Sequence, residues 1–219
     1  PQVAADLEVR GEAFTPVDID LSRGCTVITG ANMGGKTVSL RAVTLSLLLC
    51  QCGFFVFAAR AELPLFHRAA LILADSGPGG GGLSSFGVEV HALDALLRES
   101  RGIFFFLALD EFARGTNPQE GAALARTLVQ YLNGLHCVAL MTTHYDGVSD
   151  AARAHYQVAG LVREISGDEG DDPRTRIARR MDYRLLPAPP GAPCPRDALR
   201  VCRLLDLDAN LLSLFSENS

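Results

Sequence analysis

A glycine-rich loop at residues 30–37 constrains the fold of this chain more than any other feature. It has the pattern G-x-x-x-x-G-K-T, and its residues are Gly30, Ala31, Asn32, Met33, Gly34, Gly35, Lys36 and Thr37. An apolar, β-rich run at residues 25–29 precedes it, and a helical pattern follows from Thr37 onward. Such glycines let successive backbone N–H groups turn toward phosphate oxygens at a helix amino terminus, so the loop predicts a P-loop that binds ATP.

Two side chains of this loop are expected to contact the phosphates and the metal ion. Lys36 should reach the β and γ phosphates, and the Thr37 hydroxyl should bind Mg²⁺. Lys36 is the only lysine among the 20 lysine and arginine residues of the chain. A compact ammonium fits between phosphate oxygens where a planar guanidinium is too wide. The alternative is a glycine-rich turn without a ligand, and the strand–loop–helix context favours the P-loop.

A second buried strand is predicted at residues 103–109, and it ends on Asp110 and Glu111. This is the form of a Walker B element, in which Asp110 would hold Mg²⁺ through water and Glu111 would orient or deprotonate the attacking water. The alternative is two acids that cap the next element.

A third strand, residues 137–141, leads through two threonines to His144, which is expected to touch the γ phosphate. A lone histidine is otherwise more often structural.

A helix is predicted between these strands, at residues 117–133. Asn117 can cap it, Pro118 suits its first position, Glu120 can reach back to the cap, and Gly134 ends it. Its inner side is expected to carry Ala123, Leu124, Leu128, Tyr131 and Leu132.

Strands separated by helices and long connections predict an α/β fold, a P-loop NTPase with a three-layer, mainly parallel sheet. Ligands of such sheets bind beyond the carboxyl ends of the strands, where all three motifs lie. Residues 1–186 are expected to form this domain. Residues 187–219 are expected to form a proline-rich linker and a C-terminal helical segment, at about 196–205 and 211–215. Because the chain begins at Pro1 rather than Met, we expect a piece of a longer protein whose N-terminal domains are absent.

The net charge and the apolar segments argue against some classes of protein. A net charge of −5 argues against a chain that coats nucleic acid by itself, although a locally basic face or DNA contact through other domains stays open. The longest apolar stretch, residues 45–59, is too short and too interrupted to cross a bilayer, so it predicts a buried helix that runs into a strand or loop. No secretory signal is visible.

The six cysteines lack a C-x-x-C pair and metal-ligand spacing. They are therefore expected to be reduced thiols, several of them in the core of a cytoplasmic protein, with zinc ligation as the alternative.

Taken together, these residues resemble the ATPase domain of the MutS family. The resemblance covers roughly residues 14–160, and the matching strings, in the family's order and spacing, are residues 29–37, 61–66, 84–86, 110–116 and 142–145. Residues 115–121 are more similar to the second MutS branch, whose members lack the mismatch-reading domain. Ala31 stands where the family usually has proline, and Phe112-Ala113 where leucine or isoleucine followed by glycine is common.

The resemblance implies an ABC-type ATPase that works with Mg²⁺ as a homodimer and is linked to DNA mismatch repair or DNA maintenance. It also implies that the partner's Ser84 and Ser85 complete each site; taken alone, these serines predict only a helix cap. Phe14 would stack on adenine, and residues 112–117 would lie near the dimer interface. DNA would be a partner of the full-length protein, and no membrane is implied.

Two other functions stay open at this point. One is a MutS-like ATPase that remodels a protein or ribonucleoprotein complex outside repair. The other is a nucleotide-dependent dimerisation module with negligible hydrolysis. The second of these is disfavoured by the presence together of Lys36, Thr37, Asp110, Glu111 and His144.

Overall fold

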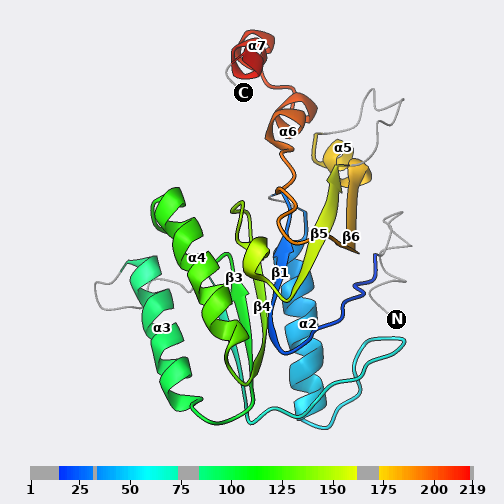
Figure 1. The fold of residues 1–219 in the computed structure, drawn as a ribbon. Coiled ribbons are helices and arrows are strands. Elements are labelled where there is room, and N and C mark those ends of the chain that lie inside the picture. Colours follow the sequence, from blue (N-terminus) through cyan, green and yellow to red (C-terminus); the bar gives the residue numbers. More distant parts are fainter. Residues whose placement is uncertain (1–14, 32–33, 74–83, 162–172, 218–219) are drawn as a thin grey trace.

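The computed structural model describes residues 15–31, 34–73, 84–161 and 173–217 (Figure 1). Phe14, Asn32, Met33 and the glycine run at residues 79–82 lie outside this part. The strands are β1 (Gly24–Thr29), β2 (Arg68–Leu73), β3 (Phe105–Asp110), β4 (Cys137–Thr143), β5 (Ala154–Leu161) and β6 (Met181–Pro187). The helices are α2 (Lys36–Gln51), α3 (Ser85–Glu99), α4 (Pro118–Asn133), the 3₁₀ turn η1 (Ser149–Ala151), α5 (Pro173–Arg180), α6 (Ala198–Leu204) and α7 (Ala209–Glu217).

The strands form one six-stranded sheet in the order β2-β3-β4-β1-β5-β6. The four pairings among the first five of these positions are parallel, and only β6 pairs antiparallel, to β5. β1 lies between β4 and β5, so the glycine loop that follows it emerges near the middle of the sheet. The predicted mainly parallel α/β sheet is confirmed.

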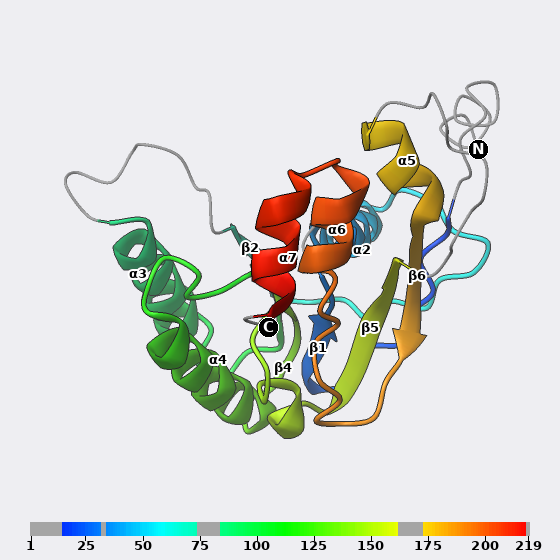
Figure 2. The same ribbon diagram turned by 90° about the horizontal axis from the view of Figure 1, so that it is seen from above.

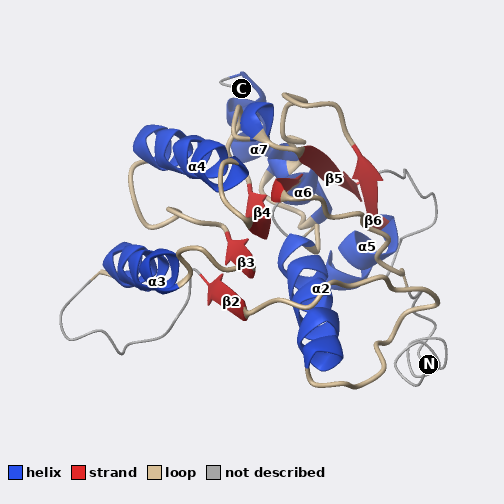
Figure 3. Cartoon of the chain, turned by 60° about the horizontal axis from the view of Figure 1, so that its bottom comes forward, coloured by secondary structure: helices blue, strands red, loops and turns tan. Residues whose placement is uncertain are grey.

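Helices cover both faces of this sheet, which explains why β1, β3 and β4 are buried along their whole length. On one face α3 and α4 pack against strand residues such as Val27, Leu107 and Met141. On the other, Leu40 and Leu47 of α2 pack against Ile28, Phe106 and Leu140, together with the segment before β1. Figure 3 shows α3 and α4 on one side of the strands and α2 on the other, giving the three predicted layers.

The helix α4 begins and ends where the sequence predicts, but its inner face was predicted wrongly in part. Asn117 caps it by accepting the Gln119 N–H at 2.9 Å, whereas Glu120 accepts the Thr116 hydroxyl at 3.4 Å. The buried side chains are not the expected Ala123, Leu124 and Tyr131, which are exposed. They are Gly121, Ala125, Leu128, Val129 and Leu132. Small residues face inward because α4 packs so closely that a Cβ on Gly121 would lie 2.6 Å from the Tyr145 hydroxyl oxygen.

The apolar stretch at residues 45–59 is helical only as far as Gln51 and is buried only in part. Leu47 is buried, but Leu45 and Leu48 on the outer side of α2 are exposed, and Phe55 in the following loop is 99% exposed. The prediction of a buried segment was wrong here because α2 covers the sheet with one side only. None of the described helices is both long and apolar enough to cross a membrane.

The segment at residues 188–197, which we call the C-terminal strap, leads from β6 to α6. His155 hydrogen-bonds the carbonyl oxygen of Pro189 at 2.9 Å, and the Cys194 N–H donates to Asp146 at 2.8 Å. Beyond the strap, α6 and α7 project from the carboxyl edge of the sheet (Figures 1 and 2). They correspond to the two helical pieces expected in the C-terminal segment. The expected division of the chain after residue 186 stays a prediction.

Candidate functional site

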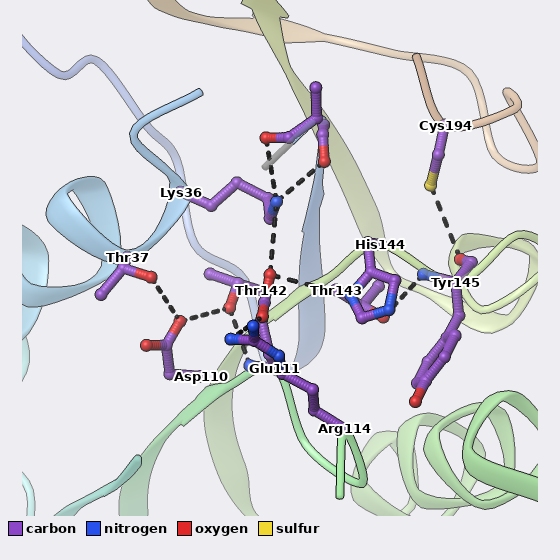
Figure 4. Close-up of polar contacts among 12 residues, drawn as sticks. Lys36, Thr37, Asp110, Glu111, Arg114, Thr142, Thr143, His144, Tyr145 and Cys194 are labelled. Carbon is purple, nitrogen blue, oxygen red and sulfur yellow. Dashed lines mark hydrogen bonds and ion pairs between the residues drawn. The ribbon is translucent and has the colours of Figure 1, made fainter. Parts of the chain in front are cut away.

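The carboxyl edge of the sheet brings the three sequence motifs together. β1 ends at Thr29 and opens into the glycine loop, β3 ends at Asp110, and β4 ends one residue before His144. Thr29 is in register with Thr143, and Asp110 is in register with Thr142. The side chains that follow these strands therefore gather in one polar cluster (Figure 4).

Lys36 opens α2 and points back into the glycine loop. It is 4% exposed, and its Nζ donates to the carbonyl oxygens of Gly30 at 2.8 Å and Ala31 at 3.1 Å. It also lies 3.4 Å from Glu111 Oε1. Burial lowers the pKa of the Lys36 ammonium, and the nearby Glu111 carboxylate opposes that shift. The loop backbone and Glu111 thus both hold the ammonium in place.

Asp110 is held by two threonines. Its Oδ1 accepts from the Thr37 hydroxyl at 3.0 Å and from the Thr142 hydroxyl at 2.7 Å. A carboxylate beside a hydroxyl at the end of a strand is the oxygen donor set that Mg²⁺ prefers. Thr37 and Asp110 therefore fit a magnesium ion.

Glu111 is buried among three basic side chains. Its carboxylate lies 3.4 Å from Lys36 Nζ, 3.1 Å from Arg114 and 3.7 Å from His144 Nδ1. Its backbone N–H donates to Thr142, to the carbonyl oxygen at 3.1 Å and to the hydroxyl at 3.0 Å. Thr142 thus orients both acids, through Asp110 Oδ1 and through the Glu111 backbone. The arrangement fixes a carboxylate within reach of the lysine at the glycine loop.

Of the predicted site residues that the structure describes, most come together, and Ser84 and Ser85 do not join the cluster within this chain. Ser84 caps α3 by accepting the Gly87 N–H at 3.2 Å, as its alternative interpretation predicted. Ser85 lies against Gly115, where an added Cβ would be 2.9 Å from the serine hydroxyl oxygen. The described residues that meet at the carboxyl edge are Gly30, Ala31, Gly34, Gly35, Lys36, Thr37, Asp110, Glu111 and His144.

Sequence reasoning gave no role to several residues of the site. Arg114 and Thr142 lie within the matching strings but carry no local signal of their contacts with Glu111. Cys194 comes from the strap, which the sequence indicates only as a linker. Its Sγ lies 3.7 Å from the Tyr145 carbonyl oxygen, and burial raises the pKa of the Cys194 thiol to about 11. The strap therefore borders the site, which no spacing in the sequence indicates.

The fold and the site define an α/β protein with a mainly parallel sheet and a cluster of lysine, threonine and paired carboxylates at its carboxyl edge. The chain belongs to the MutS domain V family, whose family model matches residues 26–176.

Among similar proteins, a "DNA mismatch repair protein MutS" of Thermus thermophilus is 39% identical over 62% of this chain. An "Endonuclease MutS2" of Thermomicrobium roseum is 33% identical over 90% of the chain, and one of Caldicellulosiruptor bescii is 31% identical over 94%. The chain spans only 17%, 24% and 25% of the length of these three relatives.

Proposed function

We propose that this chain is the ATP-binding and ATP-hydrolysing domain of a MutS-family protein, an ABC-type switch that dimerises when ATP binds. The observation that carries the proposal is the convergence of Lys36, Thr37, Asp110 and Glu111 at the carboxyl end of β1 and β3. Membership of the MutS domain V family supports it.

The phosphates of ATP would lie on the glycine loop at the amino terminus of α2, where backbone N–H groups and the helix dipole attract anions. Lys36 would exchange its contacts with the Gly30 and Ala31 carbonyls and with Glu111 for the β and γ phosphates. Mg²⁺ held by Thr37 and Asp110 would supply positive charge to the phosphates.

Glu111 is the proposed general base. Once Lys36 turns to a phosphate, Glu111 Oε1 becomes available to accept a proton from the attacking water, while Arg114 holds Oε2 at 3.1 Å. His144, 3.7 Å from Glu111 Oε1, is placed to contact the γ phosphate beside that water. In this scheme the binding of ATP to the glycine loop draws Lys36 away from Glu111 and so frees the Glu111 carboxylate to act as a base.

The proposals of a dimer and of a link to DNA are based on membership of the MutS domain V family. Ser84 and Ser85 are exposed at the amino end of α3, and we propose that they complete the site of a second copy. The matches to proteins named "Endonuclease MutS2" cover 90% and 94% of the chain, which favours the second MutS branch without a mismatch-reading domain. We propose that the longer protein acts on DNA, in mismatch repair or DNA maintenance.

Removal of the Lys36 ammonium tests the proposal. The Lys36→Ala variant should lose ATP binding by about 100-fold or more, because the buried cation between the phosphates is gone. Isothermal calorimetry with ATP and Mg²⁺ measures the loss. Arg41→Ala is the matched control, since it removes an exposed cation from the same helix and should bind as the wild type does. Tight binding by Lys36→Ala would exclude the phosphate-loop assignment.

A further inference from the structure

The loop that follows Glu111 has an unusual backbone. Glu111 has φ of 50° and Ala113 has φ of 65°, so two residues that are not glycine adopt the left-handed conformation within three positions. Such conformations persist where the surroundings hold them and often occur at functional sites.

Both polar groups of Ala113 are held by buried side chains from other elements. Its N–H donates to Glu89 Oε2 at 3.1 Å, and its carbonyl oxygen accepts from the Tyr145 hydroxyl at 3.1 Å. Glu89 is 3% exposed, Tyr145 8% and Ala113 0%. The Tyr145 hydroxyl is protonated near neutral pH and can donate, and burial raises its pKa further. We call Glu89, Ala113 and Tyr145 the Ala113 clamp.

The clamp is connected directly to Glu111. The left-handed turn at Ala113 lets the Arg114 N–H donate to the Glu111 carbonyl oxygen at 3.1 Å, and it brings the Arg114 guanidinium to 3.1 Å from Glu111 Oε2. The position of the Glu111 carboxylate therefore depends on the turn that Glu89 and Tyr145 hold.

The clamp is also connected to the amino end of α3, the helix that begins with Ser85. The first two turns of α3 touch the loop at three points. These points are Ser85 against Gly115, the Phe86 ring 6.3 Å from the Phe112 ring, and Glu89 on Ala113. Any shift of the amino end of α3 must therefore be transmitted to this loop, because packed interiors leave few alternative positions.

We propose that Glu89 is a positioning residue for Glu111, and that it couples the exposed end of α3 to hydrolysis in the same chain. This inference rests on the proposed function, in which Ser84 and Ser85 meet the nucleotide of a second copy. Contact there would move α3, Glu89 would carry the movement to Ala113, and Arg114 would carry it to the Glu111 carboxylate.

Substitution of Glu89 separates positioning from binding. In Glu89→Ala the kcat for ATP hydrolysis should fall about 10-fold or more, because the base is misplaced. The KM, and the Kd from calorimetry, should stay near the wild-type values, because the glycine loop is untouched. Glu89→Gln keeps an acceptor oxygen and should retain most of the kcat. Glu99→Ala removes an exposed acid from the other end of α3 and serves as the control.

Two further variants test whether Glu89 acts through the backbone of Ala113. Glycine adopts a left-handed φ without strain, so Ala113→Gly should restore part of the kcat that Glu89→Ala loses. Tyr145→Phe removes only the hydroxyl on the other side of the clamp and should also lower kcat, which keeps the test open if Glu89→Ala does not fold.

The possible outcomes are distinct. Wild-type protein that neither binds nor hydrolyses ATP would overturn the proposed function and this inference together. Wild-type binding and kcat in both Glu89→Ala and Tyr145→Phe would overturn the positioning role alone. The positioning role would also be overturned if Glu89→Ala lost kcat and ATP affinity equally, Glu89→Gln showed the same losses, and Ala113→Gly restored neither.

Discussion

At the scale of single residues, Glu111 links the glycine loop to the rest of the site. Its carboxylate touches the lysine of the loop, the arginine that follows it and the histidine after β4. The proposed mechanism gives these contacts an order, because Lys36 must leave Glu111 when a phosphate arrives. In that order Glu111 would act through Oε1 while Arg114 still holds Oε2.

The Glu111→Gln variant should therefore bind ATP but hydrolyse it at least about 100-fold more slowly, because an amide cannot accept the proton of water. Phosphate release at saturating ATP gives the rate, and calorimetry gives the affinity. Glu62→Gln, an exposed acid in the loop after α2, should behave as the wild type does. Unchanged turnover in Glu111→Gln would assign the base to another group.

Residues within one motif could be found from the sequence, and residues that meet across the fold could not. Lys36 and Thr37 are adjacent in the chain, as are Asp110 and Glu111, so spacing alone predicted each pair. The contacts of Glu89 and Tyr145 with Ala113 join residues 24 and 32 positions apart. They depend on how deeply α3 and the end of β4 pack around one loop, which no local pattern expresses.

At the scale of elements, helix ends follow local chemistry more closely than helix faces do. The start of α4 was predicted correctly because an asparagine before a proline specifies a cap within two residues. Its inner face was predicted wrongly because the expected set mixed two sides of the helix. The buried Gly121, Ala125, Leu128, Val129 and Leu132 follow the 3.6-residue period, whereas Ala123 lies among the polar residues and Leu124 and Tyr131 lie at the border of the apolar side.

The cap of α4 gives a stability test. Asn117→Ala should lower the free energy of unfolding by about 1 kcal/mol, because the Gln119 N–H loses its acceptor. Chemical denaturation measures the change, with Gln119→Ala as a neighbouring exposed control. No loss of stability in Asn117→Ala would mean that water replaces the cap without cost.

At the scale of the whole molecule, the sequence predicted the kind of sheet but not its order. Three apolar strands before the motifs were enough to predict parallel pairing and ligands at the carboxyl edge. The placement of β1 between β4 and β5 follows from long-range packing, as does the antiparallel β6 at the edge. For the same reason the C-terminal strap, predicted only as a linker, was not expected to border the site.

The proposed dimer can be tested on α3. Replacing Ser84 and Ser85 together by leucine should abolish ATP-dependent dimerisation in light scattering, because bulky side chains cannot approach a nucleotide on a second copy. ATP binding by the monomer should change little, since neither serine belongs to the cluster around Lys36. His91→Leu, on an exposed part of the same helix, is the control. Dimers that persist in the double variant would exclude the cross-subunit site.

The buried Lys36 has a practical consequence for spectroscopy. Because the chain contains no other lysine, protein grown with ¹⁵N-lysine carries a single labelled side chain, and that side chain lies at the start of α2 against the glycine loop. Its nitrogen resonance would follow the exchange of Glu111 for a phosphate directly, without assignment of any other signal.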